Sequence, residues 1–155
     1  EALGTGDRDQ MAEAYAVVEE LLKTNNDPEL SLLAADLAFG ASGMTEVFTS
    51  ALQDMETISE GTPEDLEAVL ETLDVELIAA GAGHVQSAVD AGAEVTDTQY
   101  VIAGAALFSS AVEKAGGFEQ VGNLTEGDDG YEELKEAEEF LTAGGADDLL
   151  EMFEQ

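Results

Sequence analysis

The chain has 155 residues, of which 45% are apolar and 36 are Asp or Glu against 4 Lys or Arg, for a formal net charge of −32. This length and apolar content suit one domain with a sizeable core, so we predict a single helical domain over residues 1–155. Four basic side chains cannot form the cluster that phosphate binding needs, which argues against a nucleic-acid partner. The absence of cysteine excludes disulfides and thiolate chemistry.

The acidic residues are spread over nearly every segment rather than gathered in blocks. In about 1 M salt the Debye length falls to ~3 Å, so the self-repulsion of such a chain is largely screened. With only three lysines and 16 glycines, this composition resembles haloarchaeal and other salt-in proteins. We therefore expect a protein of a halophile's cytoplasm that needs molar K⁺ or Na⁺ for stability. The apolar periodicity described next disfavours an acidic disordered chain.

Start and stop signals divide the first half of the chain into four predicted helices. The first has one apolar face, and the second begins at Asp27-Pro28, where aspartate caps and proline takes the first helical position. The third has the clearest amphipathic pattern, and the fourth begins at Thr62-Pro63. Their predicted ranges are 7–23, 28–40, 44–60 and 62–73.

The second half of the chain is organised around the stretch from Thr96 to Gly117, which carries no charge from Thr98 to Val112. Thr96 and Gln99 have the spacing of a capping box, and Gly116-Gly117 is a C-terminal stop. Fifteen uncharged residues are too few to span a bilayer, so no membrane span is predicted. The stretch predicts a helix over about 97–115 that is buried on nearly every side.

The remaining segments complete an all-α prediction, with no alternating pattern typical of strands. A helix from Asp74 contains Gly81 and Gly83, which we expect to allow a close crossing with Gly104; a break at Gly81 to Gly83 is the alternative. A helix from Tyr131 and a short terminal one follow. The predicted architecture is an irregular or orthogonal bundle of about six to eight helices around the central helix.

Few side chains combine into a recognisable chemical site. His84 is the only histidine, and its i−4 and i+4 neighbours are alanines, so a helical zinc motif is absent. Ser87 could complete a site with it, and Asp36 and Glu76 are the acids most closely flanked by apolar residues. These four are the candidate pocket residues; no catalytic residue, metal or cofactor is predicted.

The leading functional hypothesis is a non-enzymatic structural, assembly or regulatory protein that acts through a protein partner or as a homo-oligomer. The candidate interface residues are apolar ones on two amphipathic stretches: Met44, Phe48, Met55, Leu149, Leu150 and Phe153. The alternative is a small enzyme or ligand-binding protein with a pocket near His84. Because the chain starts at Glu1, a domain excised from a longer chain, or a processed component of an extracellular or virion assembly, remains a second interpretation.

Overall fold

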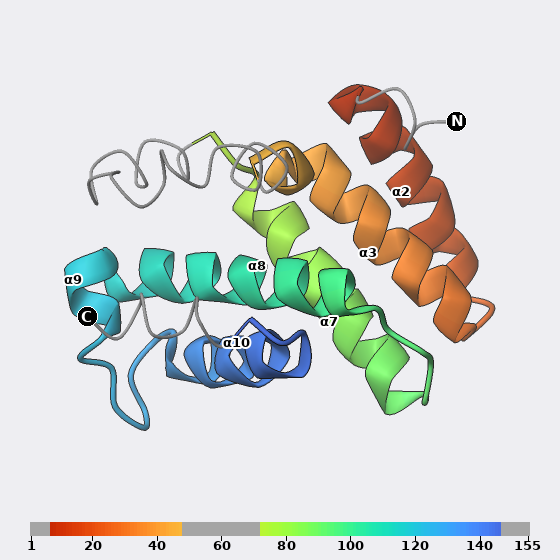
Figure 1. Cartoon of the computed structure of the whole chain (residues 1–155). Coiled ribbons are helices and arrows are strands. Elements are labelled where there is room, and N and C mark those ends of the chain that lie inside the picture. The colour runs from red at the N-terminus through yellow and green to blue at the C-terminus, as the bar shows by residue number, and fades with distance from the viewer. Residues whose placement is uncertain (1–6, 48–71, 147–155) are drawn as a thin grey trace.

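The computed structural model describes residues 7–47 and 72–146, and every regular element within them is a helix (Figure 1). The predicted all-α class is therefore confirmed. The predicted helix at 62–73 and most of the one at 44–60 lie outside the described residues, although Met44 to Val47 are helical. The elements are α2 (Arg8–Leu22), α3 (Pro28–Ser42), α7 (Val75–Asp90), α8 (Asp97–Ala115), α9 (Phe118–Val121) and α10 (Tyr131–Ala143).

Side-chain caps explain where four of these helices begin, namely α2, α3, α7 and α8. Asp7, Asp27 and Asp74 each accept a backbone N–H of the following turn through the side chain. At α8 the capping box is complete: the Gln99 N–H donates to Thr96 Oγ1 at 3.3 Å, and the Thr96 N–H donates to Gln99 Oε1 at 3.1 Å. The start signals at Asp27-Pro28 and at Thr96 with Gln99 are thus confirmed.

One predicted helix end was wrong. The second helix does not stop at Gly40 but continues to Ser42, and Gly43 ends it with a left-handed φ of 89°. Gly40 lies inside α3, where the thioether of Met11 packs on it and fills the space that a Cβ would take. A packing contact with α2, rather than a turn, explains this glycine.

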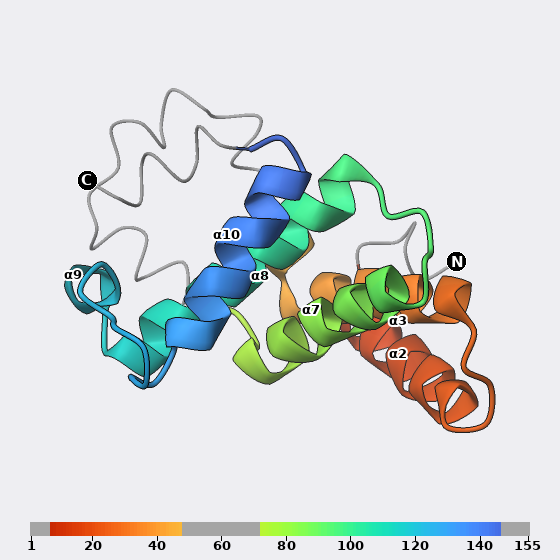
Figure 2. The same cartoon turned by 90° about the horizontal axis from the view of Figure 1, so that it is seen from below.

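The helices pack in a sequence of neighbouring pairs. Figures 1 and 2 show α2 and α3 side by side at one end, α8 and α10 side by side at the other, and α7 between them. α7 contacts both α3 and α8, and the short α9 packs on α8. The N-terminal hairpin α2–α3 therefore joins the rest of the described fold mainly through α7.

α8 is buried as the uncharged stretch predicts: no residue from 101 to 112 is exposed. Phe108 and Val112 of α8 belong to the main core cluster, together with Phe39 from α3 and Ile78 from α7. A second cluster, centred on Met11, holds α2 against α3. No helix in the described part of the chain is long and apolar enough to cross a membrane.

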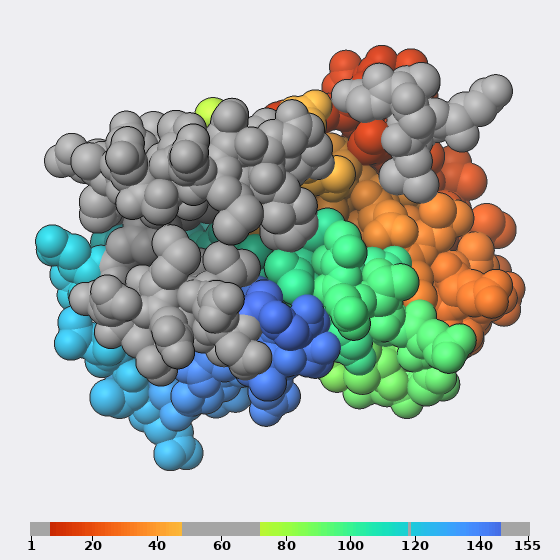
Figure 3. All heavy atoms as spheres, in the orientation of Figure 1, coloured from red at the N-terminus to blue at the C-terminus, as the bar shows by residue number. Residues whose placement is uncertain are grey.

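The predicted glycine-to-glycine crossing of α7 and α8 was wrong, and so was the predicted break in α7, which is continuous. Gly81 instead faces the ring of Phe39, at 2.5 Å from where its Cβ would be, and Gly104 faces Leu141 of α10. Gly144, just after α10, would place a Cβ 2.9 Å from the carbonyl oxygen of Asp97. In Figure 3 the end of α10 lies directly against the start of α8. The close approach thus joins α8 to α10.

Candidate functional site

His84 is paired with a tyrosine that the sequence analysis did not single out. Tyr15 of α2 and His84 of α7 are 3.2 Å apart between the phenolic oxygen and Nε2, and their rings meet edge to face with centroids 5.7 Å apart. Burial lowers the pKa of His84, and the nearby Glu19 carboxylate partly opposes this. Burial also raises the pKa of Tyr15, and Glu19 adds to that. The geometry favours a neutral imidazole beside a neutral phenol.

Asp36 of α3 has a partner on α8. Its carboxylate accepts from Nε2 of Gln99 at 3.3 and 3.4 Å, so the residue that completes the cap of α8 also ties α8 to α3. Burial raises the pKa of Asp36, and the Gln99 hydrogen bond offsets part of that rise. The half-buried carboxylate is held by a neutral donor.

The other candidates do not join either pair. Ser87 is exposed and donates to the carbonyl oxygen of Gly83 in its own helix at 2.8 Å, and Glu76 is exposed near the start of α7. Met44 is only 5% exposed and packs in the core, so its side chain offers no free surface. The remaining interface candidates lie outside the described residues: Phe48, Met55, Leu149, Leu150 and Phe153.

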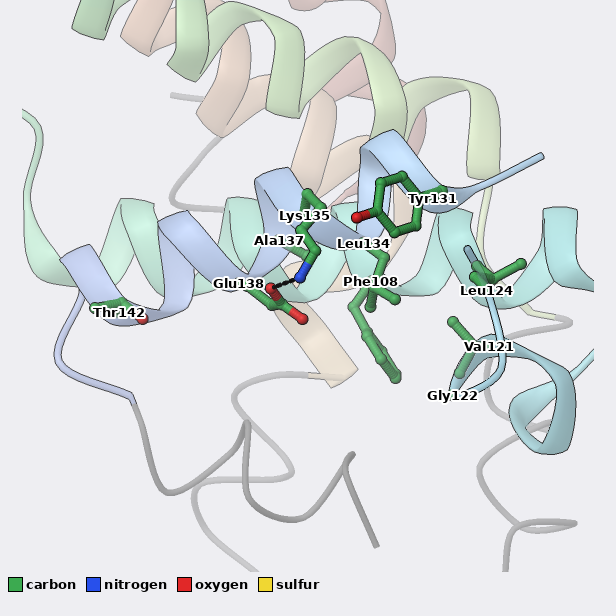
Figure 4. Close-up of a pocket in the computed structure, with 10 residues that line it drawn as sticks. All are labelled: Phe108, Val121, Gly122, Leu124, Tyr131, Leu134, Lys135, Ala137, Glu138 and Thr142. Atoms are coloured by element: carbon green, nitrogen blue, oxygen red, sulfur yellow. Dashed lines mark hydrogen bonds and ion pairs between the residues drawn. The ribbon is translucent and has the colours of Figure 1, made fainter. Parts of the chain in front are cut away.

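A hollow of about 700 Å³ lies between α8, α9 and α10, and Figure 4 shows the residues that line it. Phe108 and Leu134 point into its centre, and Val121 and Leu124 line the side towards α9. Its polar edge carries Lys135, whose Nζ lies 2.6 Å from Glu138 Oε2 and 5.9 Å from the ring centre of Tyr131. No sequence pattern predicts this hollow, because its walls come from three separate segments.

A second recess of about 390 Å³ lies where α7 and α10 both pack on α8; we call it the α7–α10 groove. We call its small and apolar lining residues, all from α7 and α8, the floor, and its charged lining residues, four glutamates and one lysine, the rim. Neither this groove nor the larger hollow is lined by His84. The complete lining is Val75, Glu76, Ala79, Gly83, Leu107, Ser110, Glu113, Lys114, Glu133 and Glu136.

The four basic side chains are all used in ion pairs. Arg8 binds Glu46 at 2.6 Å, and Lys114 of α8 binds Glu133 of α10. The other two pairs, Lys23 with Glu20 and Lys135 with Glu138, lie within single helices. Because the pairs are largely exposed, solvent screens them and each contributes little to stability. The excess of acidic charge is therefore not balanced by the protein itself.

No group of three or more His, Asp or Glu side chains within residues 7–47 and 72–146 is placed to hold a metal ion. Comparisons of the chain with protein-family models, curated proteins and solved structures find no match. Within the described residues, the candidate side chains form two separate polar pairs, Tyr15–His84 and Asp36–Gln99, and two recesses lie elsewhere on the surface.

Proposed function

We propose that this chain is a non-enzymatic helical protein of a salt-in halophile, structural, assembly or regulatory in role, that acts through protein–protein contacts. The observation that carries the proposal is the outer surface of α2. Val17 and Leu21 lie one turn apart there and are 62% and 49% exposed. Leu33 on the adjoining α3 is 37% exposed, and these three are the only large apolar side chains exposed within the described ranges.

Apolar side chains that share one helix face and remain in water favour burial against a partner. In molar salt the repulsion between two acidic surfaces acts over only ~3 Å, so apolar contacts can form despite the charge. The surrounding acids would keep the protein soluble while leaving this stripe available. A homo-oligomer and a complex with another protein are both consistent with it.

Light scattering and affinity capture in about 3 M KCl test the proposal. The double variant Val17→Glu/Leu21→Glu should lose whatever self-association or capture the wild type shows. Ala16→Glu is the matched control, because Ala16 is also exposed on α2 and the change adds charge without removing a large apolar group. A wild-type protein that stays strictly monomeric and captures no partner would contradict the proposal.

The second candidate function is ligand binding or catalysis at the Tyr15–His84 pair. The observation that favours it is the 3.2 Å contact between the phenol and Nε2, with Glu19 close enough to act on the pKa values of both. Such a group could bind or shuttle a proton. Metal and metabolite screens by thermal shift, comparing wild type with His84→Gln, test it. Unchanged unfolding midpoints across the screens would reject this candidate.

A further inference from the structure

The floor of the α7–α10 groove is built so that another chain can approach closely. Val75, Ala79 and Gly83 recur every four residues along α7 and therefore lie in one row on its surface. Ala79 and Gly83 are exposed, and a Cβ at Gly83 would meet no atom within 4 Å. Leu107 of α8, which is almost fully buried, also lines the groove. The groove is thus open to solvent, and its floor has small, mainly apolar side chains.

The rim of the groove has an uncompensated negative charge. Glu76, Glu113, Glu133 and Glu136 come from three different helices, and the one cation among the lining residues, Lys114, is already bound to Glu133. The crowding acts on the protonation of Glu136. Burial raises the pKa of Glu136, and Glu133, Glu139 and Asp90 raise it further by repulsion. A cation at this rim would offset the repulsion between these carboxylates.

We infer that the α7–α10 groove docks a basic amphipathic helix of a partner protein, with small apolar residues on the floor and Lys or Arg against the glutamates. A helix with one apolar face and basic flanks satisfies both features of the groove at once. A volume of about 390 Å³ accepts only a few small side chains. The floor therefore suits Ala and Leu rather than a row of aromatic residues.

Charge complementarity excludes a second copy of this chain as the occupant. The chain has only 4 basic side chains, and each is already in an ion pair. A second copy would thus bring mainly carboxylates to a rim of carboxylates. In molar salt only direct charge contacts survive screening, so apolar insertion carries affinity and the glutamates select for a basic partner.

The inference rests on the proposed function in that it assumes a protein partner, but it uses a different surface from the stripe on α2. The test uses the full chain in about 3 M KCl and a fluorescein-labelled synthetic helix of about four turns. This peptide has Ala and Leu on one face and Lys on both flanks. Two comparison peptides have Glu in place of Lys, or the same composition in shuffled order.

Gly83→Leu fills the floor without a clash, since nothing lies within 4 Å of its Cβ position. Ala16→Leu is the matched control: Ala16 is exposed on α2, which contributes no lining residue to the groove. We expect Gly83→Leu to weaken binding of the Lys peptide by about tenfold or more, and Ala16→Leu to leave it unchanged. Glu113→Gln/Glu136→Gln should weaken it while circular dichroism shows an unchanged helix content.

The results separate the two proposals. The Val17→Glu/Leu21→Glu variant should bind the Lys peptide as the wild type does, so loss of self-association there leaves the groove inference standing. The inference is overturned if the wild type does not bind the Lys peptide up to about 1 mM. Equal binding of either comparison peptide, or of Gly83→Leu and wild type, also overturns it.

Discussion

A methyl group on Gly104 of α8 would lie 2.7 Å from Cγ of Leu141 of α10, so the absence of a side chain at this position sets how closely the two helices pack. The same methyl group would lie 3.0 Å from the Leu141 backbone nitrogen and 3.1 Å from the Ala137 carbonyl oxygen. Backbone atoms of a helix cannot move aside as a flexible side chain can. The α8–α10 contact therefore depends on this glycine.

We predict that Gly104→Ala lowers the free energy of unfolding by about 1–3 kcal/mol, because the added group overpacks a buried contact. Gly83→Ala is the matched control, since both glycines are in the middle of a helix but Gly83 is exposed with free space around it. It should raise stability by up to about 1 kcal/mol through helix propensity. Denaturant unfolding in about 3 M KCl measures both. Equal effects of the two changes would contradict the packing argument.

These glycines also show what could and could not be predicted from the sequence. The starts of α3, α7 and α8 follow from Asp27, Asp74 and Thr96, since a cap is a local interaction within one turn. Which helix approaches Gly104 is decided by tertiary packing. The glycines of the helix from Asp74 predicted that this helix would be the neighbour, and no sequence pattern indicated α10. In the sequence Gly40 resembles a helix stop signal, but in the structure it makes room for Met11 inside a continuous helix.

The candidate site was less predictable than the fold for the same reason. His84 could be singled out as the only histidine, but its partner Tyr15 is 69 positions away and has the spacing of an ordinary core residue of α2. The hydrogen bond from Gln99 to Asp36 similarly joins residues 63 positions apart. No local pattern in a single sequence connects such residues.

The Tyr15–His84 contact predicts a pH dependence of stability. Burial places the pKa of His84 in the folded protein below its ordinary value of 6.5, so the unfolded chain takes up a proton first. The contribution of neutral His84 is therefore complete above about pH 6.5 and is lost as pH falls below it. Tyr15 contacts the imidazole directly, and the charge of the Glu19 carboxylate acts on the pKa of His84.

The unfolding midpoint should fall more for the wild type than for His84→Gln between pH 7.5 and 5.5, values chosen to bracket the ordinary histidine pKa of about 6.5. Glutamine can still accept the Tyr15 hydrogen bond but does not titrate. The difference should be a few degrees, since about 1 kcal/mol corresponds to about 2–4 °C for a chain of this size. Parallel curves for the two proteins would show that protonation of His84 is not linked to folding.

Asp36 predicts the opposite pH dependence. Its pKa is raised above 3.8 by burial, so its contribution is most favourable below that pH and is lost as pH rises through the folded value. Asp36→Asn keeps an acceptor for Gln99 and removes the charge, so it should raise the unfolding midpoint at pH 7 by a few degrees. The gain should shrink towards about pH 4, where the wild-type carboxyl becomes neutral.

Glu94→Gln is the control for Asp36→Asn, because it removes one negative charge from an exposed position. In about 3 M KCl general repulsion is screened, so the control should leave the midpoint almost unchanged. A gain of equal size in both variants would indicate relief of overall repulsion rather than of the burial of Asp36.

The net charge of −32 predicts that folding depends on salt. All four basic side chains are already in ion pairs, so the remaining repulsion must be screened by solvent ions. We expect helix content, measured by far-ultraviolet circular dichroism, to be low at about 0.1 M KCl, where the Debye length is ~10 Å, and to rise cooperatively towards molar salt. NaCl should act almost as well as KCl if screening is the cause, because screening depends on ionic strength and not on the identity of the cation. Full helix content in the dilute buffer would contradict the proposed adaptation to molar salt, whereas recovery with KCl alone would indicate specific potassium binding instead of screening.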